Sequence, residues 1–153
     1  MIAQHILVPI DFSAHADQAL SYALELAGKL GARLTLLHVI QRPVASARGI
    51  GVSGVSLDPY CQQVELIASE TMNDHARRVH AAGLACDVAI EHGVPFQQII
   101  DLASAKQVDL IVMGTHGRTG LQHFLLGSVA ERVVRLAPCP VLVTRSPTPT
   151  PTS

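Results

Sequence analysis

The stretch HILVPIDFSAHADQALSYALELAGKLGARLTLLHVI, residues 5–40, contains the pattern that decides the fold. It begins with an apolar run, residues 5–10, which ends at Asp11 and predicts a buried strand. From Ser13 onward, apolar residues recur at spacings of three and four, which predicts one apolar helix face that Gly31 closes. A second run, residues 33–40, is again nearly all apolar. Strands that are apolar on both sides are typical of a parallel sheet covered by helices on both faces.

The rest of the chain repeats this alternation of strands and helices. Helices are predicted from Pro59 to Gly83, from Pro95 onward and over 128–136, and strands over 86–91, 110–113 and 141–144. This order predicts an α/β fold, a doubly wound parallel sheet with helices on both faces, over residues 1–145. Residues 41–58 are predicted to form a long mobile or functional loop, and the Pro/Thr-rich tail 146–153 to be disordered.

Composition limits the classes of function. The chain has 153 residues, 48% apolar and 15% charged, which suits one domain with a sizeable core. A net charge of −1 and the absence of Trp argue against nucleic acid as a partner. No apolar run is long enough for a membrane span, and the N-terminus does not resemble a signal peptide. Cys61, Cys86 and Cys139 form neither a disulfide framework nor a CxxC site, so a cytoplasmic location is expected.

The candidate site is a glycine-rich segment, GTHGRTGLQHFLLGS, residues 114–128. In doubly wound sheets ligands bind beyond the carboxyl ends of the strands, where the strand order reverses. If the strands at 5–10 and 110–113 are neighbours there, this segment faces PIDFS, residues 9–13. Glycines at 114, 117 and 127 allow close approach and positive φ, and the helix start at Ser128 attracts anions. The segment therefore predicts a phosphate-binding loop in which Arg118 is the fixed cation.

The glycine segment also allows an interpretation that needs no phosphate. It is not a Walker loop, because the chain has lysine only at Lys29 and Lys106, and the first strand lacks a Rossmann glycine fingerprint. A plain surface loop before a capped helix is the alternative, since Ser128 and Glu131 fit a capping box. A capping box explains Ser128 but leaves the three glycines without a reason.

The block from Gly114 to Arg145, together with ILVPIDFS and LTLLHVI, resembles the universal stress protein family over residues 2–145. The resemblance implies one α/β domain with strand order 3-2-1-4-5. Glycines 114, 117 and 127 followed by Ser128 match the G-x2-G-x9-G-(S/T) motif of its ATP-binding branch. ATP, with or without Mg²⁺ or Mn²⁺, is therefore the implied ligand.

The resemblance also implies roles for individual residues. Asp11 meets the ribose or a phosphate-bound metal, Pro9 lines the site, the Val39 backbone reads the adenine edge and Met113 packs near the base. The phosphates are held by Gly114, His116, Gly117, Gly127, Ser128 and Val129. Without a ligand, Asp11 is a helix-start residue, Met113 is ordinary core, and His38 is a packed strand histidine rather than a ligand.

Three functions are compatible with these residues. The first is an ATP-binding stress-response regulator whose dimer or protein-client contacts depend on nucleotide. The second is a slow ATPase or adenylating enzyme, although the loop offers no lysine and no obvious base. The third is a nucleotide-free interaction domain. The strand at Val141–Thr144 is short and apolar and has one free side in the order 3-2-1-4-5, which predicts a homodimer formed through it.

Overall fold

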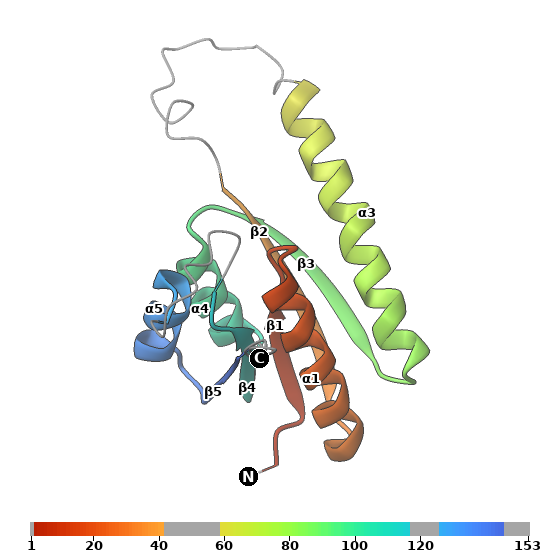
Figure 1. Ribbon diagram of the computed structural model, residues 1–153, viewed down its shortest axis with the longest axis vertical. Coiled ribbons are helices and arrows are strands. Elements are labelled where there is room, and N and C mark those ends of the chain that lie inside the picture. Colours follow the sequence, from red (N-terminus) through yellow and green to blue (C-terminus); the bar gives the residue numbers. More distant parts are fainter. Residues whose placement is uncertain (1, 42–58, 117–125, 146–153) are drawn as a thin grey trace, which may run out of the picture.

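The computed structural model describes residues 2–41, 59–116 and 126–145 (Figure 1). The long loop at 42–58, the glycine segment at 117–125 and the Pro/Thr tail, on which sequence predictions were made, lie outside the described residues.

Strands and helices alternate along the described chain as the sequence predicts. The elements are β1 (His5–Pro9), α1 (Ala14–Leu30), β2 (Arg33–Ile40), α3 (Pro59–Ala81), β3 (Cys86–His92), α4 (Pro95–Ala105), β4 (Leu110–Gly114), α5 (Ser128–Leu136) and β5 (Val141–Thr144). The strands form one parallel sheet in the order β3-β2-β1-β4-β5, which confirms the order that the family resemblance implies. The strand order therefore reverses between β1 and β4.

Local signals for the ends of helices are confirmed at three positions. The Ser13 hydroxyl accepts a hydrogen bond from the Ala16 N–H at 3.1 Å and caps α1. Gly31 ends the same helix at φ 67°, a left-handed conformation that glycine adopts without strain. Pro95 is the first residue of α4, where its missing N–H costs nothing.

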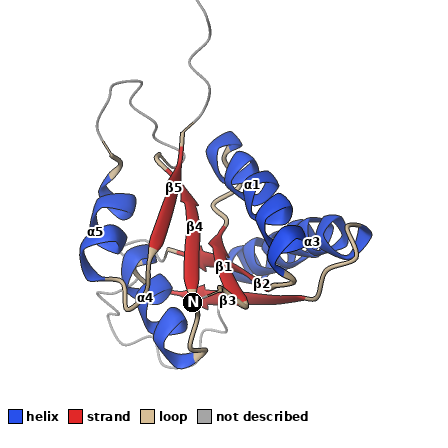
Figure 2. Cartoon of the chain, turned by 90° about the horizontal axis from the view of Figure 1, so that it is seen from below, coloured by secondary structure: helices blue, strands red, loops and turns tan. Residues whose placement is uncertain are grey.

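The sheet separates two apolar layers (Figure 2). Helices α1 and α3 cover one face, and α4 and α5 cover the other. Along β1, Ile6 and Val8 pack into the first layer while Leu7 packs into the second, and all three side chains are fully buried. Because successive strand residues point to opposite faces, burial on both sides explains why β1 and β2 are apolar without alternation.

Candidate functional site

The candidate site lies at the carboxyl ends of β1 and β4, which are neighbours in the sheet. The segment after β1 and the segment after β4 come into contact there. A Cβ atom built on Gly114 would lie 2.9 Å from the Cβ and 3.0 Å from the carbonyl oxygen of His15 in α1. The pairing confirms that β1 and β4 are neighbours at the switch point, and it brings the end of β4 to the first turn of α1. That the rest of the glycine segment faces residues 9–13 stays a prediction.

The turn between β1 and α1 is held by a compact set of contacts. An Asp11 carboxylate oxygen accepts hydrogen bonds from the Ser13 N–H, at 3.0 Å, and from the Ser13 hydroxyl. Phe12 between them has φ 66°, an uncommon conformation for a bulky residue. Its ring stacks on His38 with centroids 4.1 Å apart, and the His38 Nδ1–H donates to the Ile10 carbonyl at 2.7 Å. The stack on β2 thus stabilises a turn that local preference disfavours.

These contacts bear on two alternatives left open by the sequence. Asp11 has a structural function as an acceptor before the helix, and its contact with a ribose or metal stays a prediction. His38 is a packed strand histidine, as expected. Sequence reasoning missed Phe12, because only its backbone conformation and its partner on β2 distinguish it.

The residues expected around the base occupy different environments. Pro9 is the last residue of β1, and the pairing of β1 with β2 ends at Pro9 and Leu37, so Val39 extends beyond β1. Such an extension is compatible with a backbone contact to an adenine edge. Met113 is 5% exposed and belongs to the apolar layer under α4 and α5, which favours the alternative that it is ordinary core.

Position 127 requires glycine because two backbone segments approach each other closely there. Its N–H donates to the Thr115 carbonyl at 2.8 Å, and a Cβ at this position would lie 2.8 Å from the same oxygen. Its φ is −60°, so positive φ is not the reason for glycine here. The contact fixes the start of α5 against the end of β4, and the Gly127 N–H is already engaged within the protein.

The capping box that the alternative interpretation placed at the start of α5 does not form. Gly127 is the N-cap, Ser128 is the first helical residue, and no side chain of the described residues caps the helix. The Glu131 carboxylate instead pairs with Arg135 at 2.8 Å, because the two residues are one helical turn apart. The first N–H groups of α5, at exposed Ser128 and half-buried Val129, therefore have no side-chain acceptor among the described residues.

A histidine pair completes the described part of the site. The rings of His15, on α1, and His116, after β4, lie 5.7 Å apart at an interplanar angle of 53°. His15 was missed because it is an ordinary polar residue in the first turn of a helix by sequence, and only the β1–β4 pairing brings it to His116. Gly117 and Arg118 lie outside the described residues.

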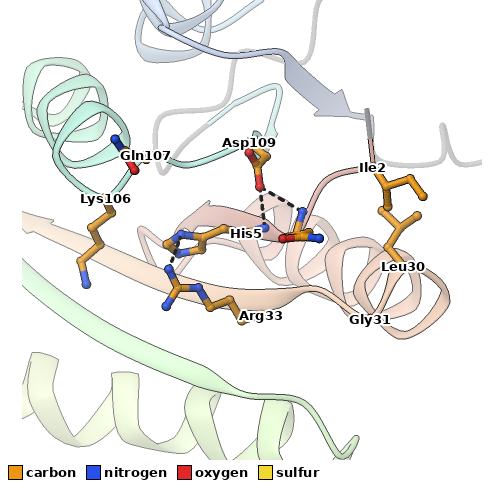
Figure 3. Close-up of a pocket in the computed structure, with 9 residues that line it drawn as sticks. Ile2, His5, Leu30, Gly31, Arg33, Lys106, Gln107 and Asp109 are labelled. Atoms are coloured by element: carbon orange, nitrogen blue, oxygen red, sulfur yellow. Dashed lines mark hydrogen bonds between the residues drawn. The ribbon is translucent and has the colours of Figure 1, made fainter.

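A hollow of about 740 Å³ lies at the opposite, amino-terminal end of the sheet (Figure 3). There, Arg33 donates to His5 Nδ1 at 3.2 Å, so His5 Nε2 carries the ring proton and donates to the Thr35 hydroxyl at 2.7 Å. Burial lowers the pKa of His5, and the charges of Arg33 and Lys106 lower it further. Since α1 and α4 both end beside this hollow, these cations offset the negative ends of two helices. We therefore do not assign it as the ligand site.

The described residues do not indicate a metal site, a reactive thiol or a membrane-spanning helix. They contain no cluster of three or more His, Cys, Asp or Glu side chains that could hold a metal ion. Burial raises the pKa of the Cys86 thiol to about 11 and also raises that of Cys139, so neither is an activated thiolate. Among the described helices, none has the length and apolar character needed to cross a membrane.

Fold and site together define a doubly wound α/β protein with a candidate ligand site at the β1–β4 switch point. The family model described as the universal stress protein family matches residues 3–145. Universal stress protein MJ0531 of Methanocaldococcus jannaschii is 34% identical over 93% of this chain and 82% of its own length. The chain belongs to the universal stress protein family.

Solved structures agree with this assignment. The structure of MJ0577, another M. jannaschii universal stress protein, superposes with a TM-score of 0.83 at 28% identity and covers 97% of this chain and 99% of its own. UspA from Lactobacillus plantarum gives a TM-score of 0.77 at 28% identity, covering 95% and 99%. A universal stress protein solved in complex with cAMP gives 0.68 at 23% identity, covering 95% and 98%, a likeness of fold alone.

Proposed function

We propose that this chain is an ATP-binding stress-response regulator whose phosphate site is formed by the segment between β4 and α5. The main observation behind the proposal is that α1 and α5 both begin at the carboxyl ends of two neighbouring strands, β1 and β4. Helix α1 begins beside β1, helix α5 begins beside the end of β4, and the first N–H groups of α5 have no side-chain cap among the described residues. The amino ends of helices attract phosphate groups through these N–H donors and the helix dipole.

Two further points support a nucleotide as the ligand. The four-residue pattern Gly114, Gly117, Gly127 and Ser128 agrees with the motif of the ATP-binding branch. Universal stress proteins of the same fold have been solved with cAMP and with dAMP, although identities of 23% and 24% extend only to the fold. Mg²⁺ or Mn²⁺ is proposed to reach the protein through the phosphates, with Asp11 as the candidate carboxylate, because the described residues offer no metal cluster.

Fast phosphoryl transfer is not part of the proposal. The two lysines of the chain lie far from this site by topology, Lys29 in the last turn of α1 and Lys106 at the end of α4. Both helix ends lie at the amino-terminal edge of the sheet. Regulation through a homodimer paired at β5 (Val141–Thr144), with a protein client and in the cytoplasm, stays a prediction, as does turnover that is slow at most.

A nucleotide-free interaction domain is the second candidate. It is favoured by the finding that Gly114 and Gly127 both have a packing reason, the contacts with His15 and Thr115, that needs no ligand.

One substitution separates the two candidates. Ser128→Asp places a carboxylate at the exposed first turn of α5, where it stabilises the helix by about 0.3–1 kcal/mol and repels phosphate. The matched control is Gln62→Asp in the exposed first turn of α3. We expect calorimetry with Mg·ATP to show binding for wild type and Gln62→Asp and a loss for Ser128→Asp, with all three folded.

The alternative outcomes are equally clear. A wild type that neither binds ATP nor gains thermal stability from it favours the interaction domain, because a ligand of the folded state must stabilise it. If Ser128→Asp binds Mg·ATP as tightly as wild type does, the start of α5 is not part of the phosphate site. Incubation of wild type with labelled ATP and Mg²⁺ or Mn²⁺ measures turnover directly.

A further inference from the structure

The hollow at the amino-terminal end of the sheet contains a buried polar pair, His5 and Thr35. The His5 ring donates from Nε2 to the Thr35 hydroxyl at 2.7 Å and accepts at Nδ1 from the Arg33 guanidinium at 3.2 Å. His5 is 4% exposed and Thr35 is fully buried. Polar side chains inside an apolar layer cost free energy unless they are paired, and two apolar residues at these positions would avoid that cost.

The buried pair fixes the direction of the Arg33 side chain. Arg33 is exposed at the start of β2, yet its guanidinium binds the buried ring of His5 (Figure 3). Burial, and then the charge of Arg33, lower the pKa of His5 below 6.5, so above that pH the ring is mostly neutral and Nδ1 is an acceptor. Among the described residues, no carboxylate forms an ion pair with this guanidinium.

Lys106 adds a second positive charge to the hollow. Its side chain extends from the end of α4 and lines the same space as Arg33 (Figure 3). Lys106 also forms no ion pair within the described part of the chain. The carboxylate in this hollow belongs to Asp109, and one of its oxygens accepts from the N–H groups of Gln4 and His5 at 3.0 Å. That oxygen is engaged by the backbone of β1, and neither cation is paired with Asp109.

Helix ends explain the positive charge at this place but not its fixed direction. The carboxyl ends of α1 and α4 each carry about half a negative charge, which any nearby lysine or arginine offsets. Such an offset needs no buried acceptor to hold the cation. A guanidinium held in one orientation instead presents parallel N–H donors, which match two oxygens of a carboxylate or phosphate group.

The hollow also has an apolar part, formed by Ile2 and Leu30 (Figure 3). Ile2 is 67% exposed, so an apolar group that covers it would remove this surface from water. The volume of about 740 Å³ is in the range of sites for small molecules. Cations and apolar surface in one hollow favour a ligand that carries both an anionic group and an apolar group.

We propose that this hollow binds a small organic anion, with its carboxylate or phosphate group on Arg33 and Lys106 and its apolar part on Ile2 and Leu30. The proposal goes beyond the proposed function and does not rest on it, because the nucleotide site is proposed at the opposite, carboxyl-terminal end of the sheet.

The test is an NMR titration of the full chain without nucleotide, with benzoate and phenyl phosphate as the anionic probes. Benzamide is the neutral probe shaped like benzoate, and inorganic phosphate is the anion without an apolar part. The variants are Arg33→Gln, Arg33→Lys and Lys106→Gln. Lys29→Gln is the matched control, because Lys29 also lies at the carboxyl end of a helix, pairs with Glu25 and does not line the hollow.

We expect benzoate or phenyl phosphate at millimolar concentration to shift the amide signals of residues that line the hollow, and to bind more tightly than benzamide or inorganic phosphate. The tighter of the two probes identifies the anionic group. Loss of a charge-assisted contact in Arg33→Gln or Lys106→Gln should weaken that probe by about tenfold or more. Arg33→Lys should weaken it too, because an ammonium group lacks the parallel donors, whereas Lys29→Gln should leave the affinity unchanged.

Three results would overturn the proposal. They are the absence of shifts at the hollow with both anions, binding of benzamide as tight as that of the anions, and an equal loss of affinity in Lys29→Gln. Unchanged affinity in Arg33→Lys would overturn the role of the oriented guanidinium. The spectrum of each variant shows whether it is folded, and Lys106→Gln at an exposed position keeps the test decisive if an Arg33 variant does not fold.

Discussion

Gly127→Ala tests whether the start of α5 depends on a close approach of two backbone segments. The added Cβ would lie 2.8 Å from the Thr115 carbonyl oxygen and 3.4 Å from the His116 Cα. Neither neighbour is the end of a flexible side chain, so the backbone itself must move by several tenths of an ångström. The φ and ψ of Gly127, −60° and 157°, are accessible to alanine, so the effect comes from the contact and not from the conformation.

The magnitude follows from three contributions. Overpacking of this kind costs about 1–3 kcal/mol. Lengthening of the 2.8 Å hydrogen bond from Gly127 to Thr115 adds about 0.5–1.5 kcal/mol. Alanine also reduces the conformational freedom of the unfolded chain, which offsets about 0.4–1 kcal/mol of this loss. The free energy of unfolding should therefore fall by about 0.5–4 kcal/mol, which lowers Tm by roughly 1–16 °C for a domain of this size.

The assay is thermal and urea unfolding without nucleotide, with Gly28→Ala as the control. Gly28 lies within α1 and a Cβ there meets nothing within 4 Å, so alanine should stabilise the protein by about 0.5–1 kcal/mol. From sequence alone, Gly127→Val is expected to abolish ATP binding with little loss of stability. The close approach instead predicts a loss of stability for any larger residue at 127, and the effect on ATP binding stays a prediction. If Gly127→Ala unfolds at or above the wild-type temperature, the reasoning is refuted.

Three further predictions concern assembly, ligand and pH. Val143→Lys on β5 should convert a dimer to a monomer in light scattering, because it places a charge on the paired edge. Val88→Lys on β3, the other edge strand, should leave the dimer intact. A wild type that is monomeric at micromolar concentration would contradict the β5 interface. Asp11→Asn keeps an acceptor for Ser13 but removes the charge, so Mg·ATP binding should weaken by about 1.5–3 kcal/mol at unchanged Tm, whereas an unchanged titration would remove Asp11 from the site. Because folding lowers the pKa of His5 below 6.5, its neutral form stabilises the fold fully above pH 6.5 and progressively less as the pH falls toward the folded pKa. Urea unfolding at pH 7.5 and 5.5 should show a smaller loss for His5→Gln than for wild type, and an equal loss would argue against this role.

Much of the fold could be predicted from sequence because its signals are local. Apolar runs on β1 and β2, the hydroxyl of Ser13 and the glycine at 31 act within a few residues of themselves, so their spacing in the chain is enough to place strands and helix ends. The strand order and the glycine motif came from resemblance to a family. The strand order is confirmed by the sheet, while the ligand role of the motif stays a prediction.

The arrangement of the candidate site was decided by the tertiary structure. Gly114 is constrained by His15 and Gly127 by Thr115, contacts that exist only after β4 pairs with β1 and α5 returns to the sheet. The same long-range packing makes Gly127, and not Ser128, the N-cap of α5. It also stacks Phe12 on His38 and brings His15 to His116. Sequence therefore determined the elements, because their preferences are local, and the tertiary structure alone decided which side chains and backbone segments meet between them.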